Sequence, residues 1–368
     1  MALTETEQQV LELLKVHPMA TQEALASKLS TNRSTIAGHI RNLKKKGYII
    51  GRKYVISDEQ PVTVIGGTNI DIKGIASDNL MHYTSNPGKT KVSYGGVAKN
   101  IVHNLALLDI PVSLISAVGR DSHGESIIQE LKHAGVNTNY IIQSQTHPTS
   151  TYLAILNEDY NLEMAIADMD VLSDVSPQAL AQCEQLLSQS SMVVLDTNIP
   201  EDTLKTTLDF CHNRHVKVGV EPVSTAKAAK LLPHLSKIHT ITPNIHELEI
   251  LSGTSIRTSK DVRRAALFLK AKGVENVFVT MGKEGIFGLT EDFEGTFSPP
   301  KVKISDTTGA GDGFMAGLVY GYYHHLSVPH QIQAGLGVAA ATLETTNSVN
   351  PRLSTESLNL EIIECEDE

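Results

Sequence analysis

The stretch Asp306-Thr307-Thr308-Gly309-Ala310-Gly311-Asp312-Gly313-Phe314-Met315-Ala316-Gly317 is the sharpest local signal in the 368 residues. The small residues Gly309, Ala310 and Gly311 let backbone N–H groups converge at the start of a helix, which creates an anion site. Phosphoryl transfer needs such donors together with a carboxylate that accepts the proton of the attacking hydroxyl, and Asp312 stands beside them. Taken alone, the stretch also fits a glycine-rich helix entry with an acid favoured by the helix dipole.

Two glycine-containing stretches precede it by about 200 residues. In Gly66-Gly67-Thr68-Asn69-Ile70-Asp71 a strand ends in a glycine turn that is followed by an aspartate. In Ser85-Asn86-Pro87-Gly88-Lys89-Thr90-Lys91-Val92-Ser93-Tyr94-Gly95-Gly96-Val97-Ala98-Lys99-Asn100 a glycine pair permits close backbone approach to a ligand before a helix. Each is weak alone, but their order together with Asp306–Gly317 is hard to obtain by chance.

From residue 62 onward, short β-branched apolar runs alternate with helical patterns. The runs are 62–66, 112–116, 192–196, 216–220, 238–242 and 276–280, and the helical stretches are 97–108, 122–134, 177–188, 201–213, 259–272, 313–325 and 328–344. This alternation predicts an α/β fold with a parallel sheet covered by helices on both faces. Residues 72–94 and 150–167 instead show period-2 patterns, which predict antiparallel strands forming a small separate lid.

Residues 1–57 have a different character. The first 60 residues hold nine basic and six acidic side chains, a net +3, which leaves −13 for the remainder of a chain whose net charge is −10. Apolar spacing predicts helices over 4–16, from a Thr21 cap to Leu29, and over 33–46 before Gly47. Two short strands around a Gly-Arg-Lys tip should follow.

This N-terminal pattern resembles the winged helix-turn-helix of bacterial transcription regulators. The resemblance implies DNA as a partner, with the third helix in the major groove and the hairpin tip near phosphates. Its candidate contacts are Arg33, Ser34, Thr35, His39, Arg52 and Lys53. The alternative is a small helical docking domain with solvated lysines.

Composition limits the remaining classes. With 41% apolar and 20% charged residues, the chain is an ordinary globular protein rather than a disordered or collagen-like one. No apolar run approaches the roughly 18 residues of a membrane span, and the start has no signal-peptide pattern, so we expect a cytoplasmic protein with no membrane partner. Cys183, Cys211 and Cys365 support neither a disulfide framework nor a zinc site.

The glycine motifs together resemble the ribokinase-like, or PfkB, family of carbohydrate and nucleoside kinases. The signatures are Gly95–Asn100 and Asp306–Asp312, and Asn244-Ile245-His246-Glu247 matches the Asn-x-x-Glu motif of the family. The resemblance implies a ribokinase-like kinase domain at 61–358 with lid strands from about 72–94 and 150–167, followed by an acidic tail at 359–368. It also implies ATP and Mg²⁺, potassium in many members, and a homodimer.

The family assigns a role to each matching residue. Asp312 is the expected general base, and Gly309, Ala310 and Gly311 form the expected anion hole. The acceptor would be bound by Asn69, Asp71, Gly95, Gly96, Lys99, Asn100 and Asp168. The nucleotide would be bound by Asn244, Thr280 and Gly282, with Mg²⁺ held through water by Glu247 and a monovalent cation by Asp306, Thr308 and carbonyls after Ala340. The alternatives are a helix cap for Asn244 and Glu247 and a solvated acid for Asp306.

Within the family, the sequence looks most like the pseudouridine kinases. The resemblance rests on 85–89 and 100–108, Ala167-Asp168-Met169 and Glu221-Pro222-Val223-Ser224. It implies transfer of the ATP γ-phosphate to the 5′ hydroxyl of pseudouridine. Lys99 and Glu221 depart from the Arg and Asp expected there, and Lys lacks the bidentate fork of Arg. A kinase for ribose, inosine or adenosine is the alternative, and a nucleoside-sensing transcription regulator is the alternative of another class.

Overall fold

The computed structural model of the protein describes residues 3–17, 20–50, 55–56, 60–159 and 161–358. Its N-terminal unit contains α1 (Glu5–Val16), α2 (Gln22–Lys28) and α3 (Arg33–Lys45), followed by the antiparallel pair β1 (Ile49–Ile50) and β2 (Val55–Ile56). Thr21 caps α2 as the sequence predicts, and Asn32 caps α3. The three helices enclose a small apolar core of their own, which includes Val10, Leu25 and Ile36.

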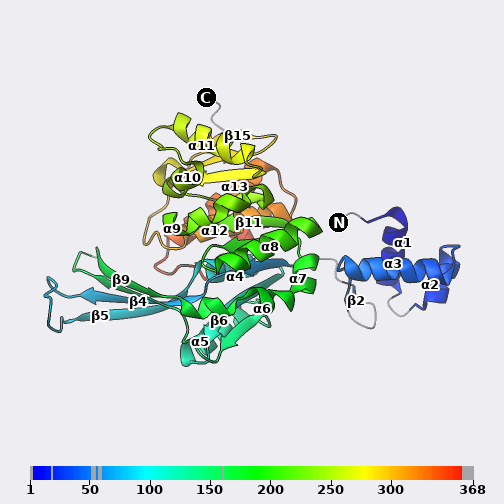
Figure 1. Cartoon of the computed structure of the whole chain (residues 1–368), viewed down its shortest axis with the longest axis horizontal. Coiled ribbons are helices and arrows are strands. Elements are labelled where there is room, and N and C mark those ends of the chain that lie inside the picture. Colours follow the sequence, from blue (N-terminus) through cyan, green and yellow to red (C-terminus); the bar gives the residue numbers. More distant parts are fainter. Residues whose placement is uncertain (1–2, 18–19, 51–54, 57–59, 160, 359–368) are drawn as a thin grey trace.

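A large mixed sheet is the centre of the molecule (Figure 1). Within the described residues nine strands follow the order β15-β14-β13-β12-β11-β10-β3-β6-β7. Their bounds are β3 (Val62–Ile65), β6 (Val112–Gly119), β7 (Ile141–Ser144), β10 (Met192–Asp196), β11 (Lys217–Glu221), β12 (Thr240–Ile241), β13 (Asn276–Thr280), β14 (Ile286–Leu289) and β15 (Glu294–Phe297). The strands from β13 to β7 pair in parallel, which confirms the predicted parallel sheet, whereas β14 and β15 are antiparallel additions at one edge that were not predicted.

Helices cover both faces of this sheet. Their bounds are α4 (Val97–Leu107), α5 (Ser122–His133), α6 (Pro177–Ala181), α7 (Glu184–Gln189), α8 (Glu201–Arg214), α9 (Thr225–Ala228), α10 (Ile245–Ser252), α11 (Ser259–Ala271), α12 (Ala310–Tyr323) and α13 (Val328–Leu343). Short 3-10 turns lie at Asp170–Asp174, Ala229–Lys237, Gly282–Glu284 and Thr355–Ser357. The single helix predicted over 177–188 is divided into α6 and α7.

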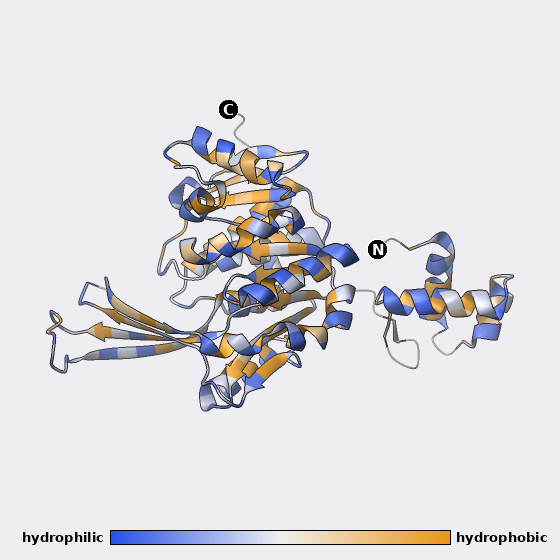
Figure 2. Cartoon of the chain, viewed as in Figure 1, coloured by the Kyte–Doolittle hydropathy of each residue, from blue (hydrophilic) through white to orange (hydrophobic). Residues whose placement is uncertain are grey.

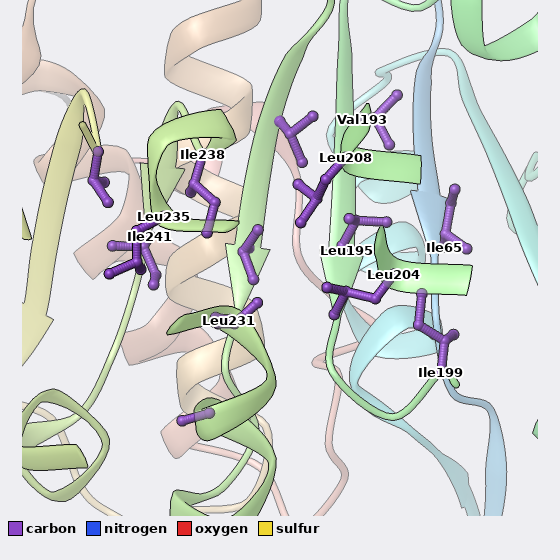
Figure 3. Packing of buried hydrophobic residues seen from close by; sticks show 14 of the residues in the cluster. Ile65, Val193, Leu195, Ile199, Leu204, Leu208, Leu231, Leu235, Ile238 and Ile241 are labelled. Atoms are coloured by element: carbon purple, nitrogen blue, oxygen red, sulfur yellow. The ribbon is translucent and has the colours of Figure 1, made fainter. Parts of the chain in front are cut away.

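Alternating strand residues supply two apolar layers. Val193 and Leu195 of β10 pack with α8 on one face, and Met192 and Val194 pack with α4 and α12 on the other. Figure 3 shows Val193 and Leu195 beside Leu204 and Leu208 of α8. Because both faces of the strands are buried, their sequences are continuous apolar runs, visible as orange strands in Figure 2.

The lid is a second sheet that projects from the main body (Figure 1). Its described strands are β4 (Asn69–Ala76), β5 (Gly88–Gly95), β8 (Thr151–Leu156) and β9 (Leu162–Asp168), in the order β5-β4-β8-β9. The two hairpins are antiparallel as predicted, but β4 and β8 pair in parallel, so the prediction of an entirely antiparallel lid was wrong. The reason is topological: each hairpin leaves the main sheet and returns to it separately, and both leave in the same direction.

The remaining compositional predictions concern cysteines and membranes. Cys183 and Cys211 are buried free thiols, and burial raises the pKa of Cys211 to about 12, whereas Cys365 and the acidic tail lie outside the described residues. None of the helices in the described part of the chain is both long and apolar enough to cross a membrane.

Candidate active site

Asp312 lies in the first turn of α12, after Gly309 begins the helix in a left-handed conformation with φ +84°. A Cβ atom on Gly309 would stand 2.3 Å from the carbonyl oxygen of Ser348, so this position requires glycine. The first N–H groups of a helix have no acceptor within the helix, and here they belong to the predicted anion hole. The sequence-predicted donors and base therefore share one helix start.

The side chain of Asp312 is held from the opposite wall by α4. Asn100 Nδ2 donates to Asp312 Oδ2 over 2.8 Å, and Asn100 Oδ1 accepts from Ser348 Oγ over 2.9 Å. Burial raises the pKa of Asp312 to about 7; the charges of Asp196 and Asp71 add to this rise, and the Asn100 hydrogen bond opposes it. A carboxyl group with a pKa near neutrality is suited to accept a proton at neutral pH.

The two glycine stretches meet beside this carboxylate. Asn69 Nδ2 donates to Asp71 Oδ1 over 2.7 Å, and burial raises the pKa of Asp71. A Cβ atom on Gly95 would lie 2.2 Å from Asp71 Oδ2, and one on Gly96, where φ is +103°, would lie 2.5 Å from Gly67 O. Glycine is needed at position 96 because the backbones of the two loops touch there, and a side chain at position 95 would displace the Asp71 carboxylate. The structure thus brings five of the predicted acceptor residues together: Asn69, Asp71, Gly95, Gly96 and Asn100.

Asp196 links these two loops by hydrogen bonds, and it is not among the residues that the sequence motifs predicted. It is fully buried at the end of β10, where Oδ2 accepts from the amides of Gly67 (2.8 Å) and Ala98 (3.0 Å) and Oδ1 accepts from the amide of Asn198 (2.8 Å). One carboxylate therefore joins the turn before β4 to the start of α4. The only sequence signal is an aspartate at the end of a buried strand, because its partners are backbone groups.

Asn244 and Glu247 form a reciprocal capping box at the start of α10. Asn244 Oδ1 accepts from the Glu247 amide over 3.0 Å, and Glu247 Oε2 accepts from the Asn244 amide over 2.9 Å. Asn244 also bridges to Thr280 at the end of β13, and Gly282 follows with φ +61°. This geometry is the helix cap that the sequence offered as the alternative role of Asn244 and Glu247. It also places Asn244 beside Thr280, as the nucleotide prediction requires.

Glu221, at the end of β11, adds another buried acid to this region. Burial raises its pKa well above the ordinary value; a hydrogen bond from Thr242 Oγ1 opposes the rise, and the charges of Asp312, Glu247 and Asp196 increase it. Burial also raises the pKa of Glu247. These acids lie near one another without a lysine or arginine ion pair in the described part of the chain, so the region is electrostatically suited to a bound cation.

Lys99 and Asp168, which were also predicted to bind the acceptor, have different surroundings from the five residues described above. The Lys99 ammonium is buried and bonds Glu130 Oε1 at 2.6 Å and the carbonyl of Tyr94 at 3.0 Å. His103 and Lys99 together hold the pKa of Glu130 at about 2, against the rise that burial alone would cause. Asp168 is exposed at the end of β9, opposite Thr151. Direct contacts of Lys99 and Asp168 with an acceptor remain predictions.

The DNA candidates in the described residues lie along α3. Arg33, Ser34 and Thr35 are exposed in its first turn, where both hydroxyls donate to the Asn32 cap, and Arg33 pairs with Glu23 at 3.1 Å. His39 is half-buried. Arg52 and Lys53 lie outside the described residues.

Comparison with known proteins shows which families have similar sequences. Residues 59–356 match the pfkB family carbohydrate kinases. The chain belongs to the PfkB family. Residues 3–53 match the MarR family, so this PfkB kinase carries a MarR-type helix-turn-helix unit at its N-terminus.

Two curated relatives of this PfkB chain come from Escherichia coli strain K12. An uncharacterized sugar kinase named YeiI is 35% identical over 352 residues, 95% of this chain and 97% of the relative. The pseudouridine kinase is 34% identical over 294 residues, 80% of this chain and 93% of the relative. The ribokinase of Arabidopsis thaliana, solved with ribose and ATP, superposes with a TM-score of 0.74 at 21% identity over 83% of this chain and 100% of that chain, and it shows the shared ribokinase-like fold.

Proposed function

We propose that this PfkB kinase transfers the γ-phosphoryl group of ATP to the 5′ hydroxyl of pseudouridine and that its N-terminal unit binds DNA. The observation that carries the transfer is the buried Asp312, whose pKa is raised to about 7 at the start of α12, where the first amides have no acceptor within the helix. The choice of pseudouridine is supported by the 34% identity to a pseudouridine kinase.

The reaction follows from what each side chain can do. Asn69 and Asp71 bind hydroxyl groups of the acceptor, and Asn100 orients the Asp312 carboxylate toward the 5′ hydroxyl. The hydroxyl oxygen attacks the γ-phosphorus as its proton passes to Asp312, and the bond from the γ-phosphorus to the ADP oxygen breaks. The amides of residues 309–311 stabilise charge on the transferring oxygens.

The acids around α10 fit a magnesium ion carried with ATP. Glu221 and Glu247 are both buried, the charge of Glu247 raises the pKa of Glu221, and a divalent cation would relieve that repulsion. The described residues contain no group of three or more His, Cys, Asp or Glu side chains that could hold a metal ion, and in this proposal Glu247 contacts Mg²⁺ through water. When bound, Mg²⁺ neutralises phosphate oxygens of ATP.

An acceptor panel tests the proposal. The full chain is incubated with ATP, Mg²⁺ and, in separate reactions, pseudouridine, uridine, ribose, inosine and adenosine, and the product is identified by ³¹P NMR. We expect pseudouridine to give the highest kcat/KM and a 5′ phosphate. A higher value for ribose, inosine or adenosine would replace pseudouridine as the acceptor and leave the kinase assignment intact.

A nucleoside-sensing regulator is the second candidate, favoured by the MarR-type unit. It would bind pseudouridine without turnover for any acceptor in the panel. DNA binding is tested by gel shift with genomic fragments, where we expect retardation that weakens as salt rises. Arg33→Ala should weaken it more than Lys15→Ala, because Lys15 lies at the end of α1 beside Glu12 rather than on α3, the helix expected to enter the major groove.

A further inference from the structure

Two lysines of the lid reach the loops that flank the anion hole. Lys73 of β4 and Lys91 of β5 are direct cross-strand partners and therefore lie side by side. Lys73 Nζ is 3.2 Å from Asp306 Oδ2, and Lys91 Nζ donates to the carbonyl of Thr346 over 3.0 Å. Both contacts join residues more than 230 positions apart in the sequence.

These contacts occupy the groups from which a monovalent cation site was predicted. Asp306 Oδ1 accepts from the amide and the hydroxyl of Thr308, at 2.9 and 2.7 Å, and Oδ2 pairs with Lys73. Although burial alone would raise the pKa of Asp306, the Thr308 and Lys73 contacts lower it, so this carboxylate stays ionised. A potassium ion here would stand beside two ammonium groups, which repel it. The residues present do not fit a potassium site.

The two loops that receive the lysines are coupled to the catalytic base. The position of Gly309 is packed against Ser348 O, where a Cβ atom would be 2.3 Å away. Ser348 Oγ in turn donates to Asn100, which holds Asp312. A positive charge on either loop therefore acts on the geometry of both the anion hole and the base.

We propose that the ammonium groups of Lys73 and Lys91 take the place of the monovalent cation, so that the lid itself orders the anion-hole loops and catalysis needs no potassium. The catalytic part of this inference rests on the proposed kinase function. The Lys73 contact is partly buried and the Lys91 contact is exposed, so their effect on folding stability is small, and their role is to position the loops.

The first test measures ion binding without turnover. Thallium(I), a potassium substitute, is titrated into the full chain and followed by ²⁰⁵Tl NMR. We expect no saturable thallium site in the wild type and a new site in the double variant Lys73→Met/Lys91→Met. Saturable binding in the wild type that is lost in Asp306→Asn would overturn the proposal, whether or not the protein phosphorylates any acceptor.

The second test measures turnover in tetramethylammonium chloride and in potassium chloride at equal ionic strength. Wild-type kcat should be the same in both salts, whereas the double variant should lose about tenfold in tetramethylammonium and recover in potassium or ammonium. Lys89→Met is the matched control, because Lys89 is exposed on the same strand, two residues from Lys91. A potassium requirement in the wild type, or full turnover of the double variant without potassium, would contradict the proposal. Absence of turnover in every protein would count against the kinase function and leave thallium binding to decide.

Discussion

We call the buried group around Asp312 the floor of the site and the partly exposed surroundings of Asp306 its rim; the two shift the pKa of a carboxylate in opposite directions. On the floor, Asp312 is buried beside other acids and its pKa is raised to about 7. At the rim, only six residues earlier in the chain, Asp306 is met by Lys73 and Thr308, and its pKa is lowered. One motif thus contains a carboxylate that can take a proton near neutrality and one that stays charged. The difference arises from the partners that the fold supplies, because the residue type is the same.

The largest effect on turnover is expected from removal of the floor carboxylate, Asp312. Asp312→Asn keeps the size of the side chain and loses the proton acceptor, so we expect kcat to fall by about 10²–10⁴-fold. Acceptor binding, measured by calorimetry, should remain detectable. Near-normal turnover would contradict the assignment of Asp312 as the base.

Asp196→Asn changes a buried floor residue whose hydrogen bonds hold the predicted acceptor-binding loops in place. The amide has one acceptor oxygen and presents an NH₂ group to at least one of the amides of Gly67, Ala98 and Asn198. A buried donor left unpaired costs about 1–3 kcal/mol, so we expect KM for the acceptor to rise by roughly 10–100-fold with KM for ATP unchanged. Hydrogen exchange at Gly67 and Ala98 should also be faster.

The control for this variant is Thr203→Val, which removes an equally buried hydrogen bond from Thr203 Oγ1 to the carbonyl of Val175 on the outer layer. It should lower the melting temperature and leave both KM values unaltered. Equal rises in both KM values for Asp196→Asn would indicate general loosening of the fold instead of loop positioning.

The smallest effect on turnover is expected far from the site in the sequence, at a partly buried ion pair in the N-terminal unit. Glu7 is inaccessible; burial alone would raise its pKa, but Lys46 at 2.6 Å and the Thr4 amide lower it to about 2. Glu7→Gln should destabilise this unit by about 1–3 kcal/mol at pH 7. Because the folded pKa is depressed below 4.5, the difference from the wild type should shrink as pH falls toward 2.

Hydrogen exchange over α1–α3 measures this loss, and the exposed Glu5→Gln is the control. Kinase turnover should not change in either variant. A Glu7→Gln variant with wild-type exchange at pH 7 would show that the pair contributes nothing to the unit.

The sequence was informative where chemistry is local and less so where it depends on long-range contacts. Asp312 and the glycines around it could be predicted because the helix start, the anion site and the base are neighbours in the chain. Asp196 could not, since its partners are backbone amides 98 and 129 residues away. The parallel pairing of β4 with β8 and the reach of Lys73 to Asp306 likewise depend on how distant segments meet.

The pH dependence of kcat/KM for the acceptor tests most directly the claim that the floor carboxylate is the proton acceptor. Measured from about pH 5.5 to about pH 9, with ATP saturating, the wild type should lose activity on the acid side with an inflection near 7, tenfold per pH unit below it, because only ionised Asp312 can accept the proton. Residual activity of Asp312→Asn should lack this inflection. A wild-type profile that is flat down to pH 5.5 would contradict the account.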